Sequence, residues 1–320
     1  MEIKNQLKSF FTEHWKYMAV STACKLNLFD SLSVEKTIGQ VAQELDLSEE
    51  KLTLLIKALH NEGFLNQSND SYVVNELSEL LTDNHPESLK YACLNWAGEH
   101  LTAWQNLDFS IETGKSAFEK VYGKPFFDYL NDHTEKLDAY HKAMYQYAKD
   151  DYKSLPERID FGKHKSIMDV GGGYGAVLEI IKNNQKELDC ILFDLESVVA
   201  NINRTNIEKI GGDFFEAIPS RTEAIILSRV LHDWDDNKAR KILLNCFEAL
   251  PDEGYLYVIE NCSDNISVDL SLLSLNMSAM CESFERTKSE YMDLAQNSGF
   301  HLIDEKQLNS LQTILIFRKQ

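Results

Sequence analysis

The chain has 320 residues, of which 43% are apolar and 26% are charged, as in an ordinary soluble globular protein. Its formal net charge of −19 repels the negatively charged phosphate backbones of nucleic acids and the surfaces of anionic membranes. We therefore expect no nucleic-acid partner and no membrane partner. The sequence has no 18-residue apolar run and no signal-peptide core, which predicts a cytoplasmic protein large enough for two domains.

The N-terminal region, residues 1–74, has the pattern of a winged helix. The expected elements are two helices in 1–32, a helix–turn–helix in 37–59 and a hairpin in 64–74. Ser48 is the expected N-cap of the second helix in the helix–turn–helix. That helix begins with Glu49 and Glu50, whereas DNA binding would require basic residues there. The charge therefore favours a dimerisation module over a DNA-binding one.

Residues 78–155 are predicted to be helical, because apolar residues recur at helical spacing with an interruption at Pro125. The last of these helices carries Tyr140, Met144 and Tyr147 on one face. Such a stripe is consistent with core packing, and it is also consistent with one wall of a pocket for a small molecule.

From Ile167 onward, short apolar runs alternate with helical segments, which predicts a parallel sheet with crossover helices. The expected strands are Ile167–Val170, Cys190–Phe193, Ile207–Ile210, Ala224–Leu227, Tyr255–Ile259 and Thr313–Phe317. The expected helices are 176–186, 196–204, 237–249 and 287–297. Thr287 and Glu290 are placed to form a capping box at the start of the last helix. We expect one domain in residues 1–155 and a second in 156–320.

A glycine-rich turn joins the first of these strands to its helix. It contains Gly171, Gly172, Gly173 and Gly175, which let the main chain approach a ligand closely at a helix N-terminus. This predicts a nucleotide- or nucleoside-binding turn. Gly171, Gly173 and Ala176 also satisfy the dinucleotide pattern G-x-G-x-x-A, so the turn alone leaves the ligand open.

Aspartates follow successive strands. Asp194 lies 23 residues after Gly171, the spacing at which a carboxylate accepts hydrogen bonds from ribose hydroxyls. Asp213 precedes Phe214, so an acceptor and an aromatic face are available together for a purine. Each aspartate alone is also consistent with a surface turn. Asp169 makes a third at a strand end, and three together favour a ligand site.

A histidine and two glutamates complete the candidate site. His232 and Trp234 lie just past a strand end, and Asp233 is adjacent, close enough to influence the imidazole. Glu260 ends the next strand and requires a partner if buried, for which His232 is a candidate. Glu285 precedes the last predicted helix. A purely structural histidine and a solvated loop carboxylate are the alternative interpretations.

The ordered motifs resemble those of S-adenosylmethionine-dependent O-methyltransferases over nearly the whole chain. The segments that carry the resemblance are the glycine turn, Phe193–Leu195, Gly211–Phe215, Leu231–Asp235, Leu250–Gly254, Glu260 and Glu285–Thr287. The type is that of caffeic acid, flavonoid and hydroxyindole enzymes and of bacterial polyketide and phenazine tailoring enzymes. The resemblance implies a Rossmann-like, doubly wound, mostly parallel class I methyltransferase sheet, preceded by an all-α, winged-helix dimerisation domain.

The resemblance also implies a set of cofactor-binding residues. These are Gly171, Gly173, Asp194, Asp213, Phe214, Ser228, Arg229 and Trp234. Gly171 would line the methionyl part of S-adenosylmethionine and Asp194 would hold its ribose. Asp213, with the two aromatic residues, would frame the adenine. Ser228 stands where plant members have a lysine and, with Arg229, is similar to bacterial relatives.

The implied reaction is methyl transfer to a hydroxyl of a small aromatic or conjugated metabolite, carried out by a homodimer. The implied reactive residues are His232 as general base, flanked by Glu260 and Glu285, and the implied acceptor-lining residues are Tyr140, Met144, Met277 and Met280. No metal is expected, because the six cysteines lack a C-x-x-C pair and no His/Cys cluster occurs. Two alternatives remain: a decarboxylase, hydroxylase or pericyclase that uses the cofactor electrostatically, and a winged-helix regulator.

Overall fold

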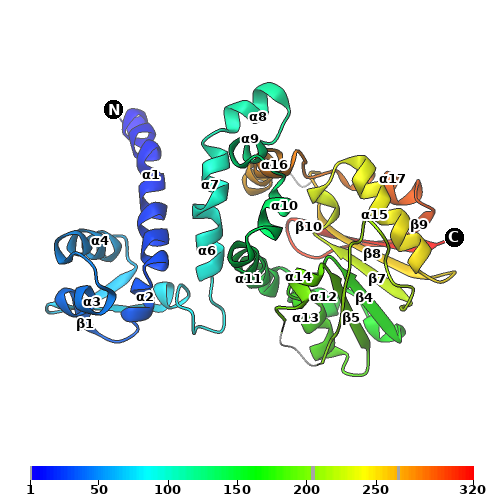
Figure 1. Cartoon of the computed structure of the whole chain (residues 1–320), viewed down its shortest axis with the longest axis horizontal. Coiled ribbons are helices and arrows are strands. Elements are labelled where there is room, and N and C mark those ends of the chain that lie inside the picture. The colour runs from blue at the N-terminus through cyan, green and yellow to red at the C-terminus, as the bar shows by residue number, and fades with distance from the viewer. Residues whose placement is uncertain (1, 203–205, 265–266) are drawn as a thin grey trace. The chain divides into compact units, whose positions relative to one another are not determined.

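The computed structural model describes residues 2–202, 206–264 and 267–320. The chain forms two compact units, Met1–Gly98 and Glu99–Gln320, whose elements are labelled in Figure 1. Within the described ranges, no helix combines the length and the apolar character needed to cross a membrane.

The first unit is a small winged helix. Its elements are α1 (Glu2–Lys25), α2 (Leu28–Ser31), β1 (Lys36–Thr37), α3 (Ile38–Leu45), α4 (Glu49–Asn61), β2 (Leu65–Ser68), β3 (Ser71–Val74), α5 (Glu76–Glu79) and α6 (Lys90–Ala97). The strands form an antiparallel sheet in the order β1-β3-β2. Thr37 caps α3 by accepting a hydrogen bond from the Gln40 backbone N–H. Ser48 holds the N-cap position of α4 as predicted, but its side chain makes no capping hydrogen bond.

The second unit begins with helices that the sequence placed in the N-terminal domain. They are α7 (Glu99–Trp104), α8 (Leu107–Thr113), α9 (Ala117–Tyr122), α10 (Phe126–Asn131), α11 (Thr134–Asp151), α12 (Leu155–Arg158) and the 3₁₀ turn η1 (Phe161–Lys163). The Trp104 indole N–H donates to the Asn276 side chain at 2.8 Å, and the Tyr145 hydroxyl donates to Glu179 at 2.6 Å. These contacts explain why the compact units divide at Gly98, whereas the expected boundary at 155/156 follows the start of the strand pattern.

The rest of the second unit is the α/β part. Its elements are β4 (Ser166–Val170), α13 (Ala176–Asn184), β5 (Asp189–Asp194), α14 (Glu196–Val199), β6 (Glu208–Gly211), β7 (Ala224–Ser228), η2 (Leu231–Asp233), α15 (Asp236–Ala249), β8 (Tyr255–Asn261), α16 (Val268–Cys281), α17 (Lys288–Gln296), β9 (Phe300–Gln307) and β10 (Gln312–Lys319). The predicted capping box of Thr287 and Glu290 is present at α17. The helix expected over 196–204 is shorter, and its last two positions, 203 and 204, lie outside the described residues.

The seven strands lie in the order β6-β5-β4-β7-β8-β10-β9. The first five are parallel, and β10 runs antiparallel to both β8 and β9. The predicted doubly wound, mostly parallel sheet is therefore present. Its strand order reverses between β4 and β7, and the carboxyl ends of strands at such a point form the ligand site of open α/β sheets.

Alternate residues of each strand bury two hydrophobic cores, one on each face of the sheet. Met168 and Val170 of β4 pack in the core that contains α15 and α17. Ile167 of the same strand packs in the opposite core, which contains Leu155 of α12 and Leu178 of α13. Figure 1 shows these two pairs of helices on the two sides of the sheet. Because successive side chains of a strand point to opposite faces, this packing determines to which face of the sheet the last side chain of each strand points.

A buried histidine at the amino ends of the strands is expected to make stability depend on pH. His164 Nε2 lies 2.7 Å from the Tyr257 hydroxyl, and burial, with Lys163 adding to it, lowers the pKa of His164 to about 4. Because the folded protein favours the neutral ring, its stabilising contribution is complete above pH 6.5 and is lost as the pH falls toward 4.

We predict that the free energy of unfolding of the wild type falls by about 2 kcal/mol more than that of His164→Gln between pH 7 and pH 4.5. Urea unfolding at a series of pH values measures this difference. Parallel pH profiles of the two proteins would contradict it.

Candidate active site

The glycine turn between β4 and α13 leaves no room for a side chain at Gly171 or Gly172. Gly171 has a φ of +72°, and a Cβ there would lie 2.9 Å from Val230. A Cβ on Gly172 would lie 2.6 Å from Leu192 and would collide with the Asp169 carboxylate. Glycine is therefore required both by backbone conformation and by close approach. The turn presents bare backbone at the N-terminus of α13, as the sequence predicted.

Two buried carboxyls lie beneath this turn. Asp194 accepts hydrogen bonds from the backbone N–H groups of Gly173 at 2.8 Å and Leu195 at 2.7 Å. Neither carboxyl oxygen of Asp169 has a hydrogen-bond partner in the described part of the chain. Burial, with Asp194 adding to it, raises the pKa of Asp169 to about 7. A buried carboxyl without a hydrogen-bond partner and with a raised pKa can be stabilised in its ionised form by a cationic group of a ligand.

An aromatic cluster stands at the end of β6 and β7. The Trp234 ring lies edge-on to Phe214 at 6.1 Å and to Phe215 at 4.8 Å between centroids. Asp213 Oδ1 accepts from the Phe215 backbone N–H at 2.7 Å, which fixes the turn. The structure thus brings together Asp213, Phe214 and Trp234, the set that the resemblance assigns to adenine. Phe215 joins them and was not part of that set.

Glu260 anchors the turn that carries His232. Its Oε1 accepts hydrogen bonds from the backbone N–H groups of Val230 at 3.0 Å and Leu231 at 2.9 Å. The turn starts at Arg229, which has a left-handed φ of +54° and donates its N–H to the Ile259 carbonyl. Glu260 therefore acts first on the backbone that precedes the histidine, whereas the sequence suggested direct pairing with the imidazole.

The imidazole of His232 lies between two other carboxylates. Its Nδ1 is 3.5 Å from Glu285 Oε1, and its Nε2 is 3.5 Å from Asp233 Oδ1. Burial lowers the pKa of His232, and Arg229 lowers it further. The carboxylates of Asp233, Glu285 and Glu260 outweigh these influences, so the net pKa is raised. Nδ1 therefore faces Glu285 without a hydrogen bond in the described part of the chain, and the ring can exchange a proton at Nε2.

Arg229 pairs with the glutamates. Its guanidinium donates to both oxygens of Glu285, at 2.7 and 2.9 Å, and lies 3.5 Å from Glu260. Burial raises the pKa of Glu285, but Arg229 and then His232 outweigh it and hold that pKa well below its ordinary value. The cofactor contact predicted for Arg229 stays a prediction, since the described hydrogen bonds of its guanidinium go to these carboxylates.

Ligand-type atoms of His232, Glu260 and Glu285 all lie within 4.8 Å of one another, as they would around a metal ion. The guanidinium of Arg229 already supplies a cation to both carboxylates. Because a second cation there would be repelled by it, we assign no metal site to this cluster.

Two residues that the sequence did not single out tie the Glu285 loop to the His232 turn. Arg286 is almost fully buried and donates to the carbonyls of Leu231 at 2.9 Å and Trp234 at 2.7 Å. The Ser283 hydroxyl donates to the His232 carbonyl. The signal available in the sequence was an arginine directly beside Glu285, a candidate site residue, since an arginine that is buried in a site requires acceptors.

The predicted acceptor residues belong to α11 and α16. Tyr140 packs edge-on against Phe126 at 5.3 Å and Phe127 at 6.1 Å, and Phe127 in turn lies 5.5 Å from Trp234. Met280 is buried in the same cluster. This apolar, aromatic wall therefore extends to the segment that carries His232.

The remaining predicted residues have less defined surroundings. Met144 on α11 and Ser228 at the end of β7 are half-buried, and Met277 on α16 is buried. Their roles stay predictions.

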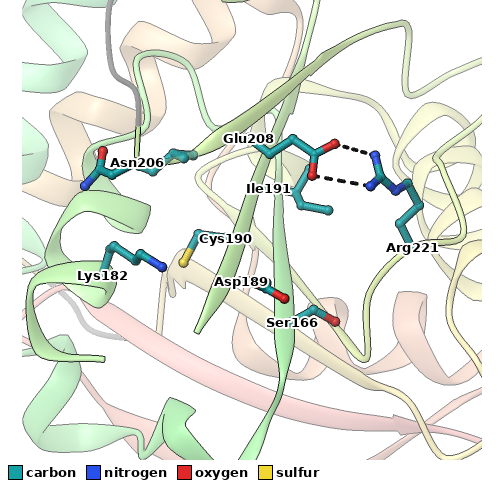
Figure 2. A pocket seen from close by; sticks show the side chains of 9 residues that line it. Ser166, Lys182, Asp189, Cys190, Ile191, Asn206, Glu208 and Arg221 are labelled. Carbon is teal, nitrogen blue, oxygen red and sulfur yellow. Dashed lines mark hydrogen bonds and ion pairs between the residues drawn. The ribbon is translucent and has the colours of Figure 1, made fainter. Parts of the chain in front are cut away.

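A cavity of about 420 Å³ lies at the amino ends of the strands, away from the carboxyl ends that carry the candidate active site (Figure 2). It is lined by the first residues of three strands, Ser166, Asp189 and Glu208, and by Arg221, which pairs with Glu208. Since the strands begin here, this cavity is separate from the candidate active site at their carboxyl ends.

Comparison with known proteins identifies the family. A sequence profile of the O-methyltransferase domain matches residues 104–301, and one of the O-methyltransferase dimerisation domain matches residues 9–84. Phenazine O-methyltransferase PhzM of Lysobacter antibioticus is 29% identical over 92% of this chain and 90% of its own. Myricetin 3-O-methyltransferase 3 of Solanum habrochaites is 31% identical over 89% and 83%. The crystal structure of LaPhzM has a TM-score of 0.93, with 28% identity over 99% of both chains.

The chain therefore belongs to the O-methyltransferase family. It is an S-adenosylmethionine-dependent enzyme. The residues present fit that cofactor, which carries an ammonium and a sulfonium, because the unpartnered carboxyl of Asp169 and the carboxylate of Asp194 lie beside a turn whose Gly171 and Gly172 leave the backbone uncovered.

We predict that Gly172→Ala weakens binding of S-adenosylhomocysteine at least tenfold and destabilises the protein by about 1–3 kcal/mol, because the added methyl group overfills the turn. Calorimetry and thermal unfolding measure the two effects. Gly39→Ala, in α3, is the control, since its Cβ would meet only the Glu49 side chain of α4, at an ordinary van der Waals distance of 3.8 Å. Equal affinity of Gly172→Ala and wild type would exclude this turn from the cofactor site.

Proposed function

We propose that this protein transfers a methyl group to a hydroxyl of a small aromatic or conjugated metabolite, with His232 as the general base. The observation that carries the proposal is the buried imidazole of His232, set between Glu285 and Asp233 at the carboxyl ends of parallel strands. The apolar wall of Tyr140 and Phe127 beside it suits a flat acceptor. The two relatives named above act, by their names, on a phenazine and on myricetin, which are both aromatic.

The chemistry begins with an acceptor hydroxyl whose pKa near 10 makes it a poor nucleophile at neutral pH. His232 takes the hydroxyl proton at Nε2, and the Glu285 carboxylate, 3.5 Å from Nδ1, stabilises the positive charge that the ring then carries. S-adenosylmethionine, when bound, supplies a methyl group on a positively charged sulfur. The buried surroundings of His232 exclude water, and the aromatic wall orients the acceptor oxygen.

The raised pKa of His232 determines when the ring can act as a base. Asp233, Glu285 and Glu260 favour the protonated ring, which cannot accept a proton. A sulfonium bound nearby acts on the ring in the same direction as Arg229, lowering its pKa. We therefore propose that cofactor binding helps to convert His232 into the base.

We predict that His232→Ala lowers kcat for a phenolic acceptor by about 10²–10⁴-fold and leaves the affinity for S-adenosylhomocysteine within about threefold of wild type. The assay follows both methylated product and S-adenosylhomocysteine, so it also separates methyl transfer from a non-methylating reaction. His85→Gln, in the first unit, is the matched control. Full activity of His232→Ala would remove His232 from the mechanism.

We also propose that the protein is a homodimer formed through its N-terminal unit. The dimerisation profile covers residues 9–84, and α1 exposes large apolar side chains that a partner could bury. These are Ile3, Leu7, Phe10, Phe11 and Trp15. Phe10 is 72% exposed and Trp15 is 65% exposed, values that are unusual for such side chains in a stable monomer.

We predict that the double variant Phe10→Glu/Trp15→Glu elutes as a monomer in size-exclusion chromatography with light scattering, because two buried charges would oppose association. Leu54→Glu, at an exposed apolar position on α4, is expected to leave the dimer intact. A dimeric double variant would show that this face of α1 is not the interface.

A further inference from the structure

The guanidinium of Arg229 lies inside the carboxylate cluster of the active site. It binds both oxygens of Glu285, at 2.7 and 2.9 Å, and approaches Glu260 at 3.5 Å. Two parallel N–H···O bonds to one carboxylate fix both groups in one plane. The backbone directs the side chain there, because residue 229 adopts the left-handed conformation at the end of β7.

Arg229 and His232 share one acceptor atom. Glu285 Oε1 is 2.7 Å from the Arg229 guanidinium and 3.5 Å from His232 Nδ1. Asn261 also reaches this oxygen, at 3.3 Å, but it carries no charge. The guanidinium thus competes with a protonated imidazole for the same negative charge.

The charged surroundings of His232 come from every element packed around it. The groups that act on the imidazole or on the groups around it include Arg229 after β7, Asp233 on η2, Lys238 on α15, Glu260 on β8, Glu285 and Arg286 before α17, Tyr140 on α11, Cys281 on α16, Tyr291 on α17 and Tyr152. Arg229 is the permanent positive charge that bonds to the carboxylates facing the imidazole.

We propose that Arg229 is a positioning residue, which occupies Glu285 and Glu260 and so weakens their stabilisation of a protonated His232 ring, leaving the imidazole better able to lose its proton and act as the base. The inference rests on the proposed role of His232. It is supported by the direction of the electrostatic influences, since burial and then Arg229 lower the pKa of His232 against the carboxylates that raise it. The sequence assigned Arg229 to the cofactor instead.

The test is the pH dependence of kcat/KM in Arg229→Gln. Without the guanidinium, His232 becomes the cation that Glu285 faces, so the acid limb of the profile moves up by about one pH unit or more. Activity at pH 7 falls at least tenfold and recovers at alkaline pH. Arg221→Gln, which breaks a surface ion pair with Glu208 far from the site, is the matched control and keeps the wild-type profile.

A direct titration of the His232 ring by NMR makes the test independent of turnover. The ring resonance is assigned by its absence in His232→Gln. If Arg229→Gln does not fold, the comparison is made between Glu285→Gln and Arg229→Gln/Glu285→Gln, in which the bidentate partner of the guanidinium is neutral in both proteins. In either background, loss of Arg229 is expected to raise the ring pKa.

The outcomes separate this inference from the proposed function. An unchanged ring pKa, or a loss of activity that is equal at all pH values, overturns the role of Arg229 while leaving His232 as the base. A raised ring pKa in an enzyme that does not need His232 supports the electrostatic role of Arg229 and overturns the proposed function.

Discussion

The candidate active site depends on charged groups that are buried at the ends of neighbouring strands and that need hydrogen-bond and ion-pair partners there. Glu260 and Glu285 come from different parts of the chain, and neither could remain ionised in this environment without a partner. Glu260 binds two backbone N–H groups, and Glu285 binds the Arg229 guanidinium. These hydrogen bonds fix the turn that carries His232, the proposed general base, relative to the strands.

The same constraint links the catalytic turn to the loop before α17. Arg286 and Ser283 bind carbonyl groups of the His232–Trp234 segment, and Glu285 lies between them in the sequence. One short loop therefore delivers a carboxylate to the imidazole and holds the backbone on which the imidazole stands. Trp234, which is predicted to lie beside the adenine, belongs to that segment too, so the same loop contacts both predicted sites.

Much of the fold could be predicted from the sequence, because its signals are local. The glycine turn, five parallel strands and the capping box at Thr287 each follow from neighbouring residues. Strand β9 was missed because it lies at the sheet edge and its exposed positions break the apolar run. Helix α16 was missed because it is apolar on most sides and shows no amphipathic stripe.

The sequence predicted which residues make up the candidate site better than it predicted the contacts between them. His232, Glu260 and Glu285 converge within 4.8 Å, as expected. The hydrogen bonds of Arg229 and Arg286 connect residues about 30 to 56 positions apart, and no local pattern specifies such pairs. The apolar, aromatic wall that contains Tyr140 and Phe127 is likewise built from helices of separate segments. Its residues therefore come together only in the folded protein.

The account is tested most directly by a crystal structure with S-adenosylhomocysteine and a phenolic acceptor bound. We predict that the acceptor oxygen lies within about 2.6–3.2 Å of His232 Nε2, on the side where the methyl group would be presented. An acceptor oxygen held by a different side chain, with the His232 ring turned away from it, would contradict the account.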